Sequence, residues 1–241
     1  MILSVVIPLY NEEHRFQRYF PELYKHISSL YSQSEFEFVC INDGSQDKTK
    51  TIIEKYRKEY SGIRHFNVYK NKGKGYALRL GVRQARGDMI FFTDIDLSAD
   101  ITALPKLIDI IEKGADIAIA SRRLKKSRIT RHQNIIRESM GKVYTSITKA
   151  FLGLPFADMT CGLKGGRSKA MKTVFSKMRI NRWSFDPEML YIARKHGMEV
   201  KEQPVVWVNN SQSKVSILLD ATRSFKEIIQ IRIYDILGYY G

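Results

Sequence analysis

The chain has 241 residues, enough for one large domain or two small ones, and its hydrophobic content of 44% is ordinary for a globular protein. Its 40 Lys and Arg residues outnumber 25 Asp and Glu residues, so the formal net charge is +15. This charge favours anionic partners, such as nucleic acid, an anionic membrane surface or a phosphorylated substrate. Two cysteines, Cys40 and Cys161, are too few for a disulfide framework and fit a reducing cytosol.

No apolar run approaches the roughly 20 residues that span a bilayer. Residues 1–8 lack the basic start of a signal peptide and have the pattern of a strand. We therefore expect a chain that is soluble or peripherally attached to a membrane.

Short apolar runs alternate with amphipathic segments along the first half of the chain. The runs typical of buried strands are residues 4–9, 36–41, 64–69, 89–93 and 116–120. The segments with helical periodicity are residues 12–30, 48–60, 76–85 and 101–113. Because parallel strands are joined by helices and buried on both faces, this order predicts an α/β fold with a mostly parallel sheet covered on both faces.

The pattern changes after residue 121. Residues 122–131 contain six basic residues and no acidic residue: Arg122, Arg123, Lys125, Lys126, Arg128 and Arg131. This run is either a solvated loop or a surface that binds an anion. Amphipathic helices are expected at residues 135–152, 185–196 and 217–239, and an extended segment at residues 198–208.

Asp94 and Asp96 follow the apolar run at residues 89–92 and are separated by one residue. On an extended chain this spacing places both carboxylates on one face. Two carboxylates at the carboxyl end of a strand suit Mg²⁺ or Mn²⁺, which keeps water and substrate phosphates as its other ligands. The alternative interpretation is a solvated loop that happens to carry two Asp residues.

Polar residues also gather at the predicted carboxyl ends of other strands. They lie at residues 8–12, 42–45, 71–75 and 121–123. Ligands of such sheets bind beyond the carboxyl ends of the strands, and packing alone does not explain polar residues gathered there. We therefore expect a ligand site at this edge of the sheet.

Several of these motifs occur together in one known family. They are Ile7-Pro8-Leu9-Tyr10-Asn11-Glu12-Glu13, Asn42-Asp43-Gly44-Ser45, Gly73-Lys74-Gly75, Asp94-Ile95-Asp96 and Ser121-Arg122. In this order they resemble the inverting glycosyltransferases of family 2, which have the Rossmann-like GT-A fold.

Motifs in the second half narrow the resemblance. They are Asp158-Met159-Thr160-Cys161-Gly162-Leu163-Lys164, Arg182-Trp183-Ser184-Phe185-Asp186-Pro187-Glu188, Pro204-Val205-Val206-Trp207 and Ser213-Lys214-Val215. They are similar to the dolichyl-phosphate sugar synthases, first to the β-glucosyltransferases and next to the mannose-transferring branch. Ser98 stands where the mannosyl branch has a Gln that binds the metal, and is a shorter ligand.

The resemblance implies an inverting hexosyltransferase that uses a nucleotide diphosphate sugar, with UDP-glucose as the favoured donor and GDP-mannose as the alternative. The acceptor would be a polyprenyl or dolichyl phosphate, and the cofactor Mg²⁺ or Mn²⁺. A family 2 enzyme acting on a soluble glycan is a further alternative. The non-enzymatic alternative is a basic nucleic-acid-binding protein, but the chain carries no motif of that class, so nucleic acid is not an expected partner.

The resemblance also implies which residues bind the donor. The positions that hold the nucleoside are Pro8, Tyr10, Glu12, Ile41 and Asp43, and Lys74 and Ile95 are further expected substrate-binding residues. Asp94 and Asp96 would hold the metal. Asp186 would lie near the donor sugar, or would serve only as an acidic residue at a helix N-terminus.

Three basic residues, Arg122, Arg137 and Lys214, match family positions that contact phosphates. Arginine suits this role because it offers bidentate hydrogen bonds. Asp158 would orient the acceptor, act as a base or anchor its loop. The predicted catalytic residues are therefore Asp96, Asp158, Arg122 and Arg137.

These roles divide the chain. We expect a GT-A transferase domain at residues 1–215, with a nucleotide-sugar half (1–121) and an acceptor half (122–215), followed by an amphipathic helix (216–241). Because the acceptor lipid lies in a bilayer, we expect peripheral attachment to the cytosolic face of a membrane. Attachment would be direct, through basic and apolar surfaces, or through a membrane partner subunit. The alternative for these helices is packing on the sheet.

Overall fold

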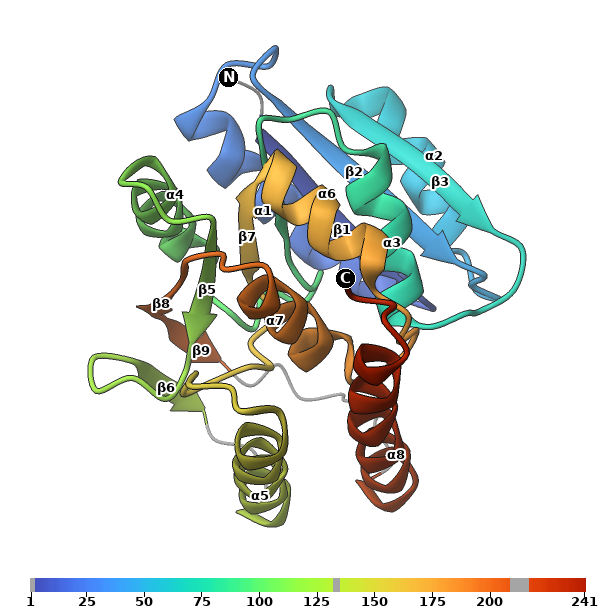
Figure 1. Ribbon diagram of the computed structural model, residues 1–241. Coiled ribbons are helices and arrows are strands. Elements are labelled where there is room, and N and C mark those ends of the chain that lie inside the picture. The colour runs from blue at the N-terminus through green and yellow to red at the C-terminus, as the bar shows by residue number, and fades with distance from the viewer. Residues whose placement is uncertain (1–2, 132–134, 209–216) are drawn as a thin grey trace.

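The structure is a computed structural model that describes residues 3–131, 135–208 and 217–241. Within these ranges only the backbone is described for residues 131, 135–137 and 217–221. Figure 1 shows the arrangement of the helices and strands.

Seven strands form the main sheet, in the order β3-β2-β1-β4-β7-β5-β8. They are β1 (Leu3–Leu9), β2 (Phe36–Asp43), β3 (Ile63–Val68), β4 (Met89–Phe92), β5 (Ile117–Ser121), β7 (Lys164–Arg167) and β8 (Val200–Pro204). Neighbouring strands are parallel, except that β7 runs antiparallel to β4 and β5. A separate two-stranded sheet pairs β6 (Arg128–Arg131) with β9 (Val206–Val208). The predicted α/β class and mostly parallel sheet are confirmed.

Helices cover both faces of this sheet (Figure 1). One face is covered by α1 (Glu13–Leu30), α2 (Thr49–Glu59) and α4 (Leu104–Glu112), the last preceded by the 3-10 turn η1 (Ile101–Ala103). The other face is covered by α3 (Lys74–Gln84), α6 (Ser168–Lys177) and α7 (Phe185–Lys195). Two further helices, α5 (Ile135–Leu152) and α8 (Ile217–Ile236), contact each other and project beyond the sheet.

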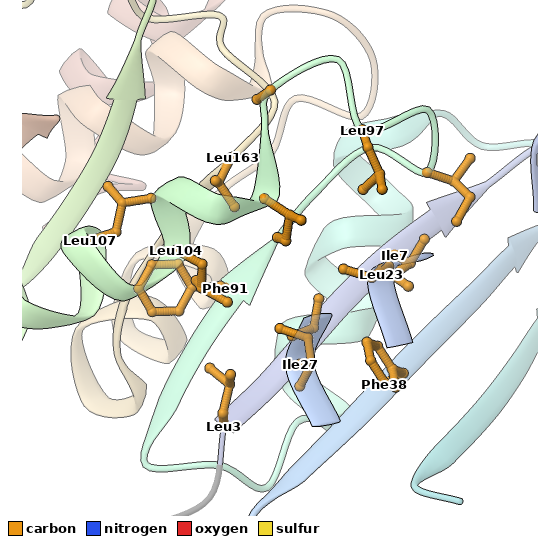
Figure 2. Close-up of a cluster of buried hydrophobic side chains, with 14 of the residues drawn as sticks. Leu3, Ile7, Leu23, Ile27, Phe38, Phe91, Leu97, Leu104, Leu107 and Leu163 are labelled. Carbon is orange, nitrogen blue, oxygen red and sulfur yellow. The ribbon is translucent and has the colours of Figure 1, made fainter. Parts of the chain in front are cut away.

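Alternating side chains of a strand enter two different cores. In β1, Leu3 and Ile7 face the core beneath α1, α2 and α4, whereas Val6 faces the core beneath α3 and α6. Figure 2 shows the first core, in which Ile27 of α1 and Leu104 of α4 lie against the strands. A sheet buried on both faces needs apolar residues on both, which explains the near-continuous apolar runs in the sequence.

The predicted elements of the first half are present, with ends shifted by no more than two residues when η1 is counted with α4. The elements β6, β7 and α6 were not predicted. The strand β7 has no apolar run, because it depends on the close approach of other chain segments to its glycines. A Cβ added at Gly165 would lie 2.3 Å from the ring of Phe91, and one at Gly166 would lie 2.2 Å from the carbonyl oxygen of Asp116.

The segment formed by α8 and the residues after it packs on the protein through one part of its surface. Ile228 and Ile231 are buried, and the hydroxyl of the buried Tyr240 donates a hydrogen bond of 2.6 Å to Glu188 of α7. Other apolar side chains stay exposed, notably Ile236 at 84% and Leu237 at 61%. Part of this segment therefore packs against the rest of the protein, including α7. None of the helices that the structure describes is long and apolar enough to cross a bilayer.

Candidate active site

A cavity of about 880 Å³ opens at the carboxyl ends of β1, β2, β4 and β5. Predicted site residues from several separate segments line it: Pro8, Tyr10, Glu12, Asp43, Lys74, Asp94, Ile95, Asp96, Arg122 and Asp186. The polar groups that were expected along one edge of the sheet therefore surround one space.

The loops after β1 and β2 hold each other by hydrogen bonds. The amide of Asn11 donates to Ser45 Oγ (2.9 Å), and the amide of Gln46 donates to Asn11 Oδ1 (2.8 Å). Asn11 has a φ of 53°, in the left-handed region that Asn adopts more readily than most residues. These bonds fix the segment from which Tyr10 and Glu12 face the cavity.

Asp43, at the end of β2, binds the loop that leads to α3. Its carboxylate accepts hydrogen bonds from the amides of Lys72 (3.0 Å) and Gly73 (2.7 Å) and from the side chain of Asn71 (3.1 Å). Burial raises the pKa of Asp43, although the amide hydrogen bonds act in the opposite direction. Asp43 therefore positions the start of α3, and with it Lys74.

Asp94 and Asp96 lie in a tight turn directly after β4. The amide of Ser98 donates to Asp96 Oδ1 (3.0 Å), and Leu97 has a φ of 48°, which residues other than glycine rarely adopt. Burial and the charge of Asp94 raise the pKa of Asp96. A cation bound between the two carboxylates would offset both the cost of burying the charge of Asp96 and its repulsion by Asp94.

This pair of carboxylates fits Mg²⁺ or Mn²⁺, which commonly takes its remaining ligands from water and phosphate. Within the described part of the chain, no group of three or more His, Cys, Asp and Glu side chains is placed to hold a metal. Two carboxylates leave most coordination positions of such an ion to water or phosphate.

Alternating charges lie in one wall of the cavity and directly behind it. Lys74 Nζ lies 2.5 Å from Asp94 Oδ1. Lys164, fully buried on β7, pairs with Asp186 and donates a hydrogen bond of 2.7 Å to the carbonyl of Cys161. Burial raises the pKa of Asp186, opposed by the charges of Lys164 and Lys74. Burial would lower the pKa of Lys74, but the nearby carboxylates outweigh it and the pKa is raised.

Arg122, directly after β5, is held by Asp158. Its Nε donates to Oδ2 (2.6 Å), its Nη2 donates to Oδ1 (2.8 Å), and its backbone amide also donates to Oδ2 (2.9 Å). Burial would raise the pKa of Asp158, but the guanidinium and amide hydrogen bonds hold it well below its usual range. A carboxylate held in this way is a poor proton acceptor. Among the three roles considered for Asp158, the geometry favours anchoring.

The outer wall of the cavity is apolar and comes from late parts of the chain. Its side chains include Met140, Val143 and Tyr144 of α5, Trp183 before α7 and Phe225 of α8. Trp183 belongs to a motif that the sequence analysis quoted, whereas the residues of α5 and α8 were not assigned to the site. Helical periodicity signalled the apolar faces of α5 and α8, but it could not show that these faces meet at the same cavity.

The family model for glycosyl transferase family 2 matches residues 4–175, well over half of the chain. The chain belongs to glycosyl transferase family 2. The predicted family is thereby confirmed. Because its relatives include glucosyltransferases, the chain is a hexosyltransferase.

The curated relatives of this family 2 transferase include dolichyl-phosphate beta-glucosyltransferases. One from Trichomonas vaginalis is 32% identical over 247 residues, which cover 98% of this chain and 74% of the relative. One from Saccharomyces cerevisiae is 30% identical, covering 100% of this chain and 77% of the relative. The human protein of that name is 28% identical, covering 98% and 76%.

Solved structures confirm the GT-A fold. The glucosyl-3-phosphoglycerate synthase of Mycobacterium tuberculosis, solved with UDP, aligns with a TM-score of 0.68 at 17% identity, covering 95% of this chain and 79% of that one. The mannosyltransferase PcManGT of Pyrobaculum calidifontis, solved with GDP-mannose and Mn²⁺, aligns with a TM-score of 0.60 at 15% identity, covering 96% and 69%. At these identities the likeness concerns the fold alone.

Among the described side chains, two predicted site residues of the transferase do not line the cavity. Ile41 and Asp158 are fully buried, Ile41 in the core beneath α3 and Asp158 against Arg122. Arg137 lies on α5, where only its backbone is described, and Lys214 lies outside the described residues. Their predicted contacts with ligands stay predictions.

The basic run at residues 122–131 is more ordered than a simple solvated loop. Arg122 is paired with Asp158, and Arg123 Nη2 donates a hydrogen bond of 3.0 Å to the carbonyl of Gly141 on α5. The last residues of the run form β6. The run therefore helps to connect α5 with the end of the main sheet.

Proposed function

We propose that this family 2 transferase moves a hexose from a nucleotide diphosphate sugar to a polyprenyl or dolichyl phosphate with inversion, and that the donor is UDP-glucose. The observation that carries the proposal is one cavity that combines two strand-end carboxylates, a cationic Arg122 and an apolar wall from α5 and α8. Relatives named dolichyl-phosphate beta-glucosyltransferases support this choice of sugar and acceptor.

Asp94 and Asp96 would hold Mg²⁺ or Mn²⁺. When bound, such an ion neutralises the charge that grows on the leaving nucleoside diphosphate. Pro8, Tyr10 and Glu12 would surround the nucleoside, because they line the cavity at the end of β1. Asp186, which lines the same cavity and accepts hydrogen bonds, would contact hydroxyl groups of the hexose.

In the reaction, an oxygen of the acceptor phosphate attacks the anomeric carbon on the face opposite the diphosphate. One carbon–oxygen bond forms as the other breaks, which inverts the configuration. The second pKa of a phosphate monoester is about 6, so much of the acceptor is already dianionic at pH 7. No residue has to remove a proton, which agrees with Asp158 acting as an anchor.

Arg122 would bind a phosphate oxygen of the acceptor or the donor. It uses Nε and Nη2 to hold Asp158, and its Nη1 makes no hydrogen bond to a described residue. Its side chain lines the cavity, so Nη1 is within the reach of a ligand there. Arg137 and Lys214 would add further phosphate contacts, as the family resemblance implies.

A donor panel tests the proposal. The full chain is incubated with a short polyprenyl phosphate, Mg²⁺ or Mn²⁺, and either UDP-glucose or GDP-mannose, and the product is identified by mass. We expect transfer from UDP-glucose to be at least about 10-fold faster, because hydroxyl contacts discriminate strongly between sugars. The anomeric coupling in the NMR spectrum should be that of a β-linkage. The matching polyprenol without phosphate is the control and should not react. An α-linked product, or transfer only to a soluble glycan, would contradict the proposal.

The proposal includes peripheral attachment to the cytosolic face of a membrane. Exposed apolar side chains occur on both projecting helices, including Ile229 and Ile233 of α8 and Phe151 of α5. The net charge of +15 adds attraction to anionic lipid. Apolar faces combined with cationic charge suit an anionic membrane interface. A membrane partner subunit would be the alternative means of attachment.

Binding to liposomes tests direct attachment. The full chain should sediment with liposomes that contain anionic lipid and should be released at high salt, because surface charges are screened over about 8–10 Å at physiological ionic strength. The double variant Ile236→Ser/Leu237→Ser should weaken binding by about 10-fold or more, since it removes two exposed apolar groups. Leu30→Ser, which changes an exposed apolar residue of α1, is the control and should bind normally. If the unaltered chain does not bind such liposomes, attachment depends on a partner subunit.

A further inference from the structure

Lys74, the first residue of α3, forms an ion pair with Asp94, one of the two carboxylates that would hold the metal. Its Nζ lies 2.5 Å from Asp94 Oδ1, and the two side chains are 27% and 42% exposed where they line the cavity. A lysine ammonium is a compact charge on a flexible four-carbon stem. Lys74 can therefore leave its partner without movement of the backbone.

Asp94 has less freedom to move than Lys74. The backbone of Gly162 lies so close to it that a Cβ on this glycine would be 2.5 Å from Asp94 Oδ2. Lys74 has a second favourable contact, because its Nζ lies 5.5 Å from the centroid of the Phe185 ring. When the pair separates, we expect Lys74 to move and Asp94 to stay.

Asp186 is already neutralised by another cation. Its Oδ1 is paired with the fully buried Lys164, which also binds the carbonyl of Cys161. Among the described side chains, Lys74 forms an ion pair only with Asp94. Lys74 therefore serves mainly to balance the charge of Asp94.

We infer that Lys74 is a resident counter-ion of Asp94, which a divalent cation displaces and which the diphosphate of the donor then binds. The inference rests on the proposed function of this site. An ammonium and a divalent cation repel each other and compete for the same carboxylate oxygen, so Lys74 lowers the affinity of the protein for the metal alone. The diphosphate offers Lys74 another anion and removes this competition. Metal and donor should thus strengthen each other's binding through Lys74.

The test measures Mn²⁺ binding to the full chain by electron paramagnetic resonance of the free ion, with and without UDP. In Lys74→Met we expect Mn²⁺ alone to bind about 10-fold more tightly than in the unaltered protein, with a correspondingly smaller gain on adding UDP. Lys72→Met is the matched control, because it removes a charge that lies over the ring of Tyr76 rather than beside a carboxylate. It should change the affinity for Mn²⁺ by less than about twofold, since an exposed charge is screened.

Two results would overturn the inference alone. Equal tightening of Mn²⁺ binding in both variants would show a general effect of net charge. Unchanged Mn²⁺ binding with weaker UDP binding in Lys74→Met would make Lys74 a phosphate ligand without a role as counter-ion. If the unaltered protein binds neither UDP nor Mn²⁺, the proposed function of the cavity fails, and the inference fails with it.

Discussion

Replacing Asp96 with Asn should lower the rate of hexose transfer by about 1,000-fold or more, because a metal supplies several kcal/mol of charge stabilisation in such transition states. Asp96 lines the cavity beside Asp94. The change should not destabilise the protein, since burial and the charge of Asp94 raise the pKa of Asp96 and the neutral amide removes that repulsion. Single-turnover kinetics measure the rate of hexose transfer, and urea unfolding measures the free energy of unfolding.

Asp109→Asn is the matched control for this change. Asp109 is an exposed residue of α4, paired with Lys113 at 2.6 Å and outside the cavity lining. This variant should transfer hexose at the normal rate, and its free energy of unfolding should change by less than about 0.5 kcal/mol. Near-normal transfer by the Asp96 variant, or full activity of the unaltered protein with a chelator, would rule out the metal site.

Replacing Lys164 with Met should lower the free energy of unfolding by about 3–5 kcal/mol, because it leaves the buried carboxylate of Asp186 without its partner. Lys164 is fully buried and does not line the cavity, and its ammonium binds Asp186 and the carbonyl of Cys161. Urea unfolding of the variant and the unaltered protein measures the difference. A loss below about 1 kcal/mol would show that the pair is not needed for stability.

A double variant separates the lost pair from the lost volume. Lys164→Met/Asp186→Leu removes both charges, so most of the stability should return, while hexose transfer should stay low because Asp186 would contact the sugar. Lys169→Met, at an exposed position of α6, is the control and should shift the free energy of unfolding by less than about 0.5 kcal/mol. A double variant as unstable as the single one would trace the loss to packing around Lys164.

The sequence by itself determined the class of fold and the edge of the sheet at which the site lies. The apolar runs at residues 36–41 and 89–93 became β2 and β4, because a strand buried on both faces needs apolar residues that are adjacent in the chain. The position of Asp94 and Asp96 followed from the end of that second run. The order of the motifs also indicated the family that the comparisons confirmed.

Tertiary structure alone decided which of these residues act together. The strand β7 exists because Gly165 and Gly166 admit Phe91 and the backbone of Asp116, and its Lys164 is paired with Asp186. Asp158 accepts hydrogen bonds from Arg122, which lies 36 positions away in the sequence. The apolar wall of the cavity needed α5 and α8 to meet there. Local periodicity could not predict these contacts, because each depends on segments that are distant in the sequence and are brought together only by the packed fold.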